Sequence, residues 1–184
     1  MARVSRIETA RLWFRPVTRG DVDPLHRLWT EPRVRKYLWD DQIIPREQAG
    51  EVVNRSVELF DHTGLGLWAV LPPGDETLIG FCGYWYFRDP PELELLYGMA
   101  PAHWGKGLAT EAARAMLRYG FEELGFRRVV GSTDVQNVAS ARVLEKAGMR
   151  FAKRARVNDL DTVFYTIPRE AFAPDDAPYR VWRA

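Results

Sequence analysis

Residues 101–112 read PAHWGKGLATEA and lie between two segments of different periodicity. The residues up to Met99 alternate and then turn apolar as in a strand, whereas apolar residues from Leu108 onward recur at helical spacing. Gly105 and Gly107 therefore lie in a loop at a helix start, where unpaired N–H groups and the helix dipole bind anions. The pattern predicts a diphosphate-binding loop, or else a tight strand-to-helix turn without a ligand.

Two other phosphate-binding motifs do not fit these residues. A P-loop requires Gly-Lys followed by Ser or Thr, whereas Gly105-Lys106 is followed by Gly107. A dinucleotide fingerprint requires Gly or Ala where Thr110 stands, and an early place in a repeated βαβ pattern. Nucleotide ligands of these two kinds are therefore disfavoured, and Lys106 is expected to add a screened positive charge at the rim of the loop.

Strand and helix patterns alternate around this loop, with a break at Asp89-Pro90-Pro91. They predict an α/β (α+β) fold with a mixed, mostly antiparallel sheet of six to seven strands and helices on both faces. One domain is expected over residues 1–168, and Tyr179 and Trp182 predict that the tail 169–184 docks on the domain or on a partner subunit. The predicted strands cover 12–16, 66–71, 77–86, 92–99, 128–134, 150–156 and 162–168, and the predicted helices cover about 21–29, 45–60, 107–121 and 137–147.

The composition disfavours several classes of protein. With 184 residues, 46% apolar content and a formal net charge of +1, the chain can bury a core but lacks the basic field that binds nucleic acid or anionic membranes. No apolar run approaches the ~20 residues of a membrane span, and no signal-peptide pattern is present, so a cytoplasmic location is expected. Cys82 is the single cysteine and His26, His62 and His103 are scattered, so no metal site is expected.

Residues 101–112 closely resemble motif A of the GNAT superfamily of acyl-coenzyme A N-acyltransferases. A second block, NVASARVLEKAGM at 137–149, resembles a helix of the RimJ/RimL-like branch, which acetylates the N-termini of ribosomal proteins. TARL at 9–12 and LIG at 78–80 fit the same branch, and the similarity runs in order over 12–168. The resemblance implies the GNAT fold and an acetyl-CoA-dependent N-acetyltransferase, in which the sheet is splayed between strands four and five to admit the coenzyme.

The resemblance also assigns residues to acetyl-CoA, the cosubstrate. It implies that the thioester carbonyl faces a backbone N–H at Met99, that Asn137 contacts the pantetheine arm, and that Trp104 acts through its backbone amide. Trp104 stands where relatives carry Arg or Gln, and Leu144 stands where many carry a tyrosine, so a tyrosine acid is not expected at that position. The expected coenzyme contacts are Tyr97, Met99, Trp104, Gly105, Lys106, Gly107, Leu108, Ala109, Thr110, Asn137 and Ser140.

Amide formation from a thioester needs an unprotonated amine, stabilisation of an oxyanion and a proton for the leaving thiolate. Glu94 is the expected base, because it matches an acidic position of this branch and lies on the same strand face as Gly98. The alternatives are a salt-bridged carboxylate at Glu94, or Glu92 as the base. Ser140 is the expected proton donor, although Asn137 and Ser140 equally suit ordinary helix capping.

The acceptor site is predicted from aromatic residues. Tyr37 and Trp85 are expected to line the amine slot, while Asp40 and Asp41 either favour a cationic acceptor or are solvated loop charges. The first choice of acceptor is a protein or peptide N-terminus. The alternatives are a small-molecule amine, such as an aminoglycoside or polyamine, and a catalytically silent acetyl-CoA-binding module. A monomer or homodimer is expected.

Overall fold

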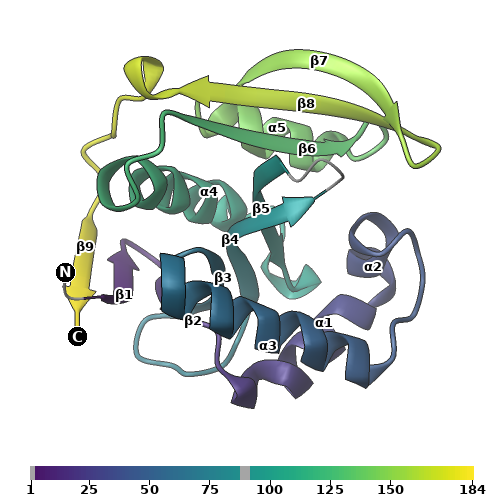
Figure 1. Cartoon of the computed structure of the whole chain (residues 1–184), viewed down its shortest axis with the longest axis horizontal. Coiled ribbons are helices and arrows are strands. Elements are labelled where there is room, and N and C mark those ends of the chain that lie inside the picture. Colours follow the sequence, from purple (N-terminus) through teal and green to yellow (C-terminus); the bar gives the residue numbers. More distant parts are fainter. Residues whose placement is uncertain (1–2, 88–91) are drawn as a thin grey trace.

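The computed structural model describes residues 3–87 and 92–184, so the predicted break at Asp89-Pro90-Pro91 lies outside the described residues. The strands form one mixed sheet in the order β7-β8-β6-β5-β4-β3-β2-β1-β9 (Figure 1). The predicted fold class is confirmed. The strands are β1 (Val4–Thr9), β2 (Trp13–Pro16), β3 (Gly66–Leu71), β4 (Gly80–Phe87), β5 (Glu92–Met99), β6 (Arg128–Asp134), β7 (Arg150–Val157), β8 (Leu160–Pro168) and β9 (Tyr179–Arg183).

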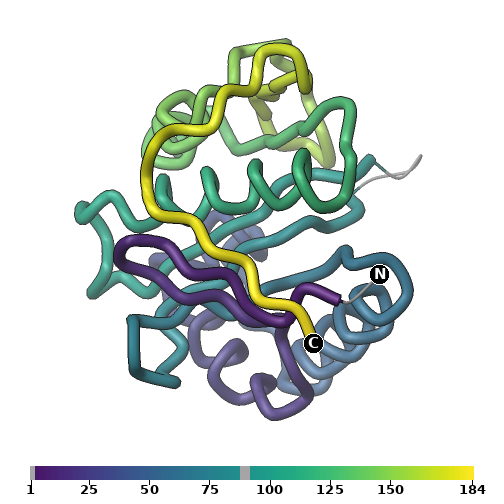
Figure 2. Tube along the Cα trace, turned by 90° about the vertical axis from the view of Figure 1, so that its left-hand side faces the viewer, coloured from purple at the N-terminus to yellow at the C-terminus, as the bar shows by residue number. Residues whose placement is uncertain are grey.

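The described residues form nine strands rather than the six to seven predicted, because β1 and β9 extend one edge of the sheet. The two strands pair with each other, for example at Ile7 and Val181, and Figure 2 shows the yellow C-terminal strand beside the purple N-terminal one. In β1 the buried residues are Val4 and Ile7. The register of β1 on β9 shifts between Val4 and Arg6, so the period-two alternation that marks a strand is absent there.

Helices cover both faces of the sheet, as predicted. They are α1 (Val22–Thr30), α2 (Pro32–Leu38), α3 (Arg46–Thr63), α4 (Leu108–Arg118) and α5 (Val138–Lys146). Every residue of β3 is buried: Leu67 and Ala69 pack in the cluster that holds α1 and α3, whereas Trp68 and Val70 pack in the cluster that holds α4 and α5. Across the described part of the chain, no helix is both long and apolar enough to span a membrane.

The sheet opens between β5 and β6, which run parallel and share one register pair, Glu94 with Val130. On its other edge β5 pairs with β4 along its whole length, from Glu92 to Met99. Beyond Glu94 the two parallel strands therefore diverge toward the end of β5 that leads into α4. This opening lies between the fourth and fifth of the predicted strands, where the splay was expected.

The C-terminal tail runs from β8 along α4 to β1 (Figure 2). Phe172 stacks on Phe121 with ring centroids 4.7 Å apart. Further along, Asp175 Oδ2 accepts a hydrogen bond from Arg114 at 3.1 Å, and the tail ends in β9. The tail thus connects the half of the sheet that contains β8 to the opposite edge at β1.

Candidate active site

The glycine loop connects β5 to α4. Gly105 and Gly107 have φ angles of 74° and 76°, in the left-handed region that glycine adopts without strain. Gly107 is the N-cap of α4, and within the described residues no side chain caps this helix. A side chain added at Gly105 would meet nothing within 4 Å, whereas Leu108 is buried and anchors the helix start. Gly105 therefore lies beside open space, and in the described part of the chain the N–H groups of the first turn of α4 have no side-chain cap, as an anion site requires.

Side chains hold this loop at three points. Trp104 Nε1 donates to Met99 O at 2.7 Å, and Lys106 Nζ donates to Ala102 O at 2.9 Å. Arg11 Nη1 donates to Lys106 O at 2.7 Å. The ammonium of Lys106 thus rests on a carbonyl of its own loop. Trp104, expected to act through its backbone alone, also uses its indole to tie the loop to the end of β5.

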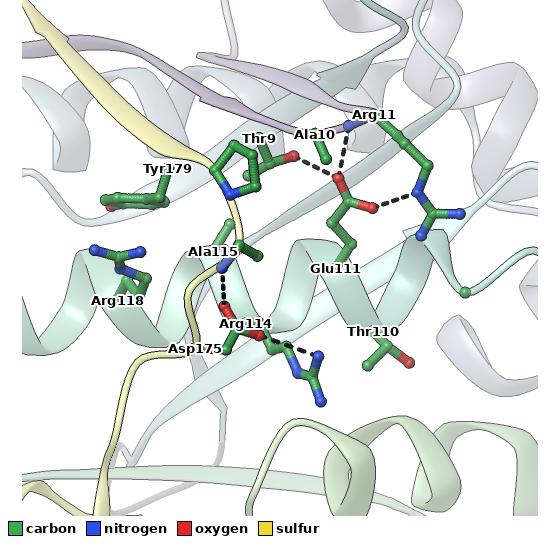
Figure 3. Close-up of a pocket in the computed structure, with 13 residues that line it drawn as sticks. Thr9, Ala10, Arg11, Thr110, Glu111, Arg114, Ala115, Arg118, Asp175 and Tyr179 are labelled. Atoms are coloured by element: carbon green, nitrogen blue, oxygen red, sulfur yellow. Dashed lines mark hydrogen bonds and ion pairs between the residues drawn. The ribbon is translucent and has the colours of Figure 1, made fainter.

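Glu111, in the first turn of α4, joins the helix to the turn between β1 and β2 (Figure 3). Its carboxylate accepts hydrogen bonds from Thr9 Oγ1 at 2.7 Å and from Arg11 Nε at 2.7 Å. These residues and Thr110 line a cavity of about 280 Å³ that adjoins the loop at Gly107, and Ala109 packs half-buried on the core. Sequence reasoning missed the roles of Arg11 and Glu111, although the TARL motif contains Arg11.

The edge of β5 that faces the opening carries backbone groups of alternate residues. Ala100 N donates to Ile79 O at 2.8 Å on the β4 side. Because successive strand residues direct their backbone groups to opposite edges, Met99 and Tyr97 direct theirs toward β6. The carbonyl of Met99 accepts the indole N–H of Trp104. The N–H of Met99 therefore faces the opening, at the position that the resemblance relates to the thioester carbonyl.

Tyr97 bridges the opening from β5 to the first turn of α5. Its hydroxyl donates to Ser140 O at 2.9 Å and lies 2.9 Å from Ser140 Oγ. Asn137 is the N-cap of α5, and its Oδ1 accepts from Ser140 N at 3.2 Å. Burial raises the pKa of Tyr97 well above its ordinary value, so its hydroxyl stays protonated. The structure thus brings together three of the residues expected to contact the coenzyme.

Leu144 does not face the opening. It is 1% exposed, and a Cβ added at Gly131 of β6 would lie 2.9 Å from Leu144 Cδ2. Leu144 therefore packs directly on the bare backbone of β6.

Glu94 is 1% exposed and lies on the other face of β5 from Tyr97. Ser132 Oγ of β6 donates to Glu94 Oε2 at 2.5 Å. Glu94 and Ser140 therefore flank the opening from opposite faces of the sheet. Glu92, the alternative base, lies 3.8 Å from Arg128 at the closed end of the strand pair. Ser132 was missed because nothing local in the sequence marks it.

The two residues predicted for the acceptor side come from different elements. Trp85 of β4 is the register partner of Glu94, so the two side chains share one face. Tyr37 of α2 donates its hydroxyl to Gln136 O at 3.4 Å, which brings α2 to the turn after β6. Burial, followed by the charge of Asp40, raises the pKa of Asp134 near that turn.

The comparisons with known proteins agree with this geometry. The acetyltransferase (GNAT) domain family matches residues 11–150. The chain is 25% identical over 172 residues to an uncharacterised N-acetyltransferase p20 of Bacillus licheniformis. The alignment covers 90% of this chain and 97% of that protein. Its fold is similar to that of a GNAT-family acetyltransferase from Bacillus anthracis, with a TM-score of 0.75, 26% identity and coverage of 90% and 99% of the two chains.

RimL, the ribosomal L7/L12 alpha-N-protein acetyltransferase solved in complex with coenzyme A, shares the fold with a TM-score of 0.74. The alignment covers 89% of this chain and 97% of RimL, with 16% identity. Membership of the RimJ/RimL-like branch therefore stays a prediction. The domain family itself spans well over half of the 184 residues and contains both the loop and α5. This chain therefore belongs to the acetyltransferase (GNAT) family and is an acetyl-CoA-dependent acetyltransferase.

Proposed function

We propose that the enzyme transfers the acetyl group of acetyl-CoA to a primary amine, with the N-terminal amine of a protein or peptide as the first choice of acceptor. The observation that carries this proposal is the opening between β5 and β6. It narrows to a single residue pair at Glu94 and has the glycine loop at its wide end. The RimL-like motif at 137–149 supports the peptide acceptor.

On the donor side, the N–H groups of Gly105 through Ala109 would hold the diphosphate. The pantetheine arm would lie along the β5 edge at Tyr97, with the first turn of α5 on its other side. The N–H of Met99 would then polarise the thioester carbonyl and stabilise the oxyanion that forms on it.

On the acceptor side, Glu94 would take the proton of the attacking amine, directly or through a water. A C–N bond forms and the C–S bond breaks. The departing thiolate would receive its proton from the hydroxyl of Ser140, which Tyr97 holds at 2.9 Å, and Ser140 would then regain a proton from solvent. Base and acid would thus act from opposite faces of the sheet, so that no proton passes directly between them.

The test is release of coenzyme A thiol from acetyl-CoA in the presence of amine acceptors, followed by mass spectrometry of the products. The panel contains N-terminal peptides, polyamines and aminoglycosides. Acetylation of peptide N-termini would support the first choice. Binding of acetyl-CoA without thiol release for any acceptor would favour the silent binding module instead.

A small cationic amine is the second candidate, because two acids from different segments lie near the turn after β6. Asp134 has a pKa raised by burial and by the charge of Asp40. A cation beside these two carboxylates would stabilise their charged forms. Under this alternative, polyamines or aminoglycosides react faster than peptides, and their KM rises with ionic strength.

A further inference from the structure

Arg11 lies in the turn between β1 and β2, which the bond from Thr9 N to Leu12 O closes at 2.9 Å. From there its guanidinium reaches the coenzyme loop. Nε donates to Glu111 Oε2 at 2.7 Å and Nη1 donates to Lys106 O at 2.7 Å. One side chain therefore contacts both the first turn of α4 and the loop before it.

The contact at Lys106 O determines which way the next amide points. In a planar trans peptide, the carbonyl of one residue and the N–H of the next point in opposite directions. Because Arg11 holds the carbonyl of Lys106, the N–H of Gly107 points away from Arg11. If this peptide turned over, a carbonyl dipole would replace the N–H on that side, and its negative end would repel a phosphate.

The loop offers little resistance of its own to such a turn. Gly105 and Gly107 flank Lys106 and both adopt φ angles near 75°, at 74° and 76°. Turning over the Lys106–Gly107 peptide changes ψ of Lys106 and φ of Gly107, and glycine populates left- and right-handed conformations about equally, so Gly107 adds little resistance. An external hydrogen bond is therefore needed to keep one orientation.

Glu111 holds Arg11 in place for this role. Its Oε1 accepts from Thr9 Oγ1 at 2.7 Å and from Arg11 N at 2.9 Å, while Oε2 accepts from Arg11 Nε at 2.7 Å. The Glu111 side chain is 15% exposed, against 52% for Arg11. The largely buried carboxylate of Glu111 thus fixes the half-exposed guanidinium of Arg11. Lysine lacks the planar fork of N–H groups and cannot reproduce this geometry.

We propose that Arg11 is a positioning residue for coenzyme binding, locking the Lys106–Gly107 peptide so that the Gly107 amide serves the diphosphate. This inference rests on the proposed coenzyme site and adds to it the residue that sets its shape. Arg11 acts through the loop rather than by contact with the reacting atoms. Its effect is therefore confined to donors that carry phosphate groups.

The experiment compares Arg11→Ala, Arg11→Lys and wild type by calorimetry with coenzyme A, and by thiol release from acetyl-CoA and from acetyl-pantetheine, which has no phosphate. Arg11→Ala is expected to raise the Kd for coenzyme A and the KM for acetyl-CoA about tenfold, the size of one hydrogen bond to a charged group. Turnover at saturation and kcat/KM for acetyl-pantetheine stay within about twofold of wild type. Arg11→Lys behaves like Arg11→Ala.

The matched control is Arg46→Ala, which removes an exposed arginine that pairs with Asp23 at 2.6 Å. Its coenzyme affinity should equal that of wild type. Glu111→Gln supplies a second route if Arg11→Ala folds poorly, because Gln keeps an acceptor for Arg11 but weakens the hold on it. It is expected to raise the same Kd by about threefold, with a normal melting curve.

Unchanged coenzyme affinity in Arg11→Ala overturns the inference. So does full affinity in Arg11→Lys, which would make charge rather than orientation the cause, and so does an equal loss with acetyl-pantetheine. Failure of the wild-type protein to bind coenzyme A is a different outcome, because it overturns the proposed coenzyme site itself.

Discussion

Ser132 Oγ of β6 donates a hydrogen bond of 2.5 Å to Glu94 Oε2 of β5. Glu94 pairs in register with Val130 of β6, and Ser132 lies two residues beyond Val130. Val130 and Ser132 share a face of β6, since they are two residues apart. The bond therefore closes the narrow end of the opening on the face that carries Trp85. It also orients the carboxylate that we propose as the base, and so connects the geometry of the splay to the acid–base chemistry.

Glu94→Gln should lower kcat about 100-fold and leave the Kd for coenzyme A unchanged. Glutamine can still accept the bond from Ser132 but cannot take a proton, and the loss should be largest at low pH, where more of the amine is protonated. Glu92→Gln is the control, since Glu92 lies 3.8 Å from Arg128 away from the opening. A pH–rate profile of Glu94→Gln that matches wild type would remove Glu94 from the mechanism.

Tyr97→Phe should lower kcat by about tenfold, because Ser140 loses the hydroxyl that orients it. Since burial raises the pKa of Tyr97, the group remains protonated across the neutral range, and the wild-type profile should show no Tyr97 limb below about pH 10. Tyr165→Phe is the control, because its hydroxyl also contacts α5, at Glu145 Oε1, 3.0 Å away. Equal rates in both variants would argue against the Tyr97–Ser140 pair.

Gly107→Val should weaken coenzyme binding by tenfold or more, measured by calorimetry. A branched side chain resists the φ of 76° and lies beside Arg11, whose Nη2 is 3.5 Å from the added Cβ. Gly74→Val is the matched control, since Gly74 has a φ of 75° and open space around it. Both variants carry similar backbone strain, so a loss of affinity shared by Gly74→Val would assign the effect to stability.

Asp21→Asn should destabilise the protein by about 3 kcal/mol at pH 7, measured by urea unfolding. Asp21 is 4% exposed, and Arg15 donates two hydrogen bonds to it, at 2.7 and 2.8 Å. Burial acts to raise the pKa of Asp21, but the bonds from Arg15 and Thr18 outweigh it, so the pKa lies below the ordinary 3.8.

Because the pKa of Asp21 is lowered on folding, its contribution to stability is complete above about pH 4 and disappears as the pH falls through the lowered value. The free energies of unfolding of wild type and Asp21→Asn should therefore converge in acid. Asp23→Asn is the control, since its pair with Arg46 is exposed and should contribute little. A difference that persists unchanged at pH 2 would contradict the ionic origin of the effect.

Much of the fold was predictable because its signals are local. Gly105 and Gly107 mark a left-handed turn, and the apolar spacing after Leu108 marks a helix, whatever the rest of the chain does. The strands that sequence reasoning missed, β1 and β9, carry weaker signals: β9 has five residues, and only Tyr179, Arg180 and Val181 alternate. A register shift disturbs the alternation of β1, and β9 is defined by its partner.

The candidate site divides in the same way. The glycine loop and the start of the helix after it could be predicted from the sequence alone, since φ preferences and unpaired helix amides depend on only a few neighbouring residues. The contacts of Arg11 with Glu111, of Tyr97 with Ser140 and of Leu144 with the bare backbone of β6 follow only from the folded chain. These contacts join residues far apart in the chain, and they depend on strand register and on where β6 leaves β5. Such features are set by the packing of the whole sheet, so no short stretch of residues specifies them.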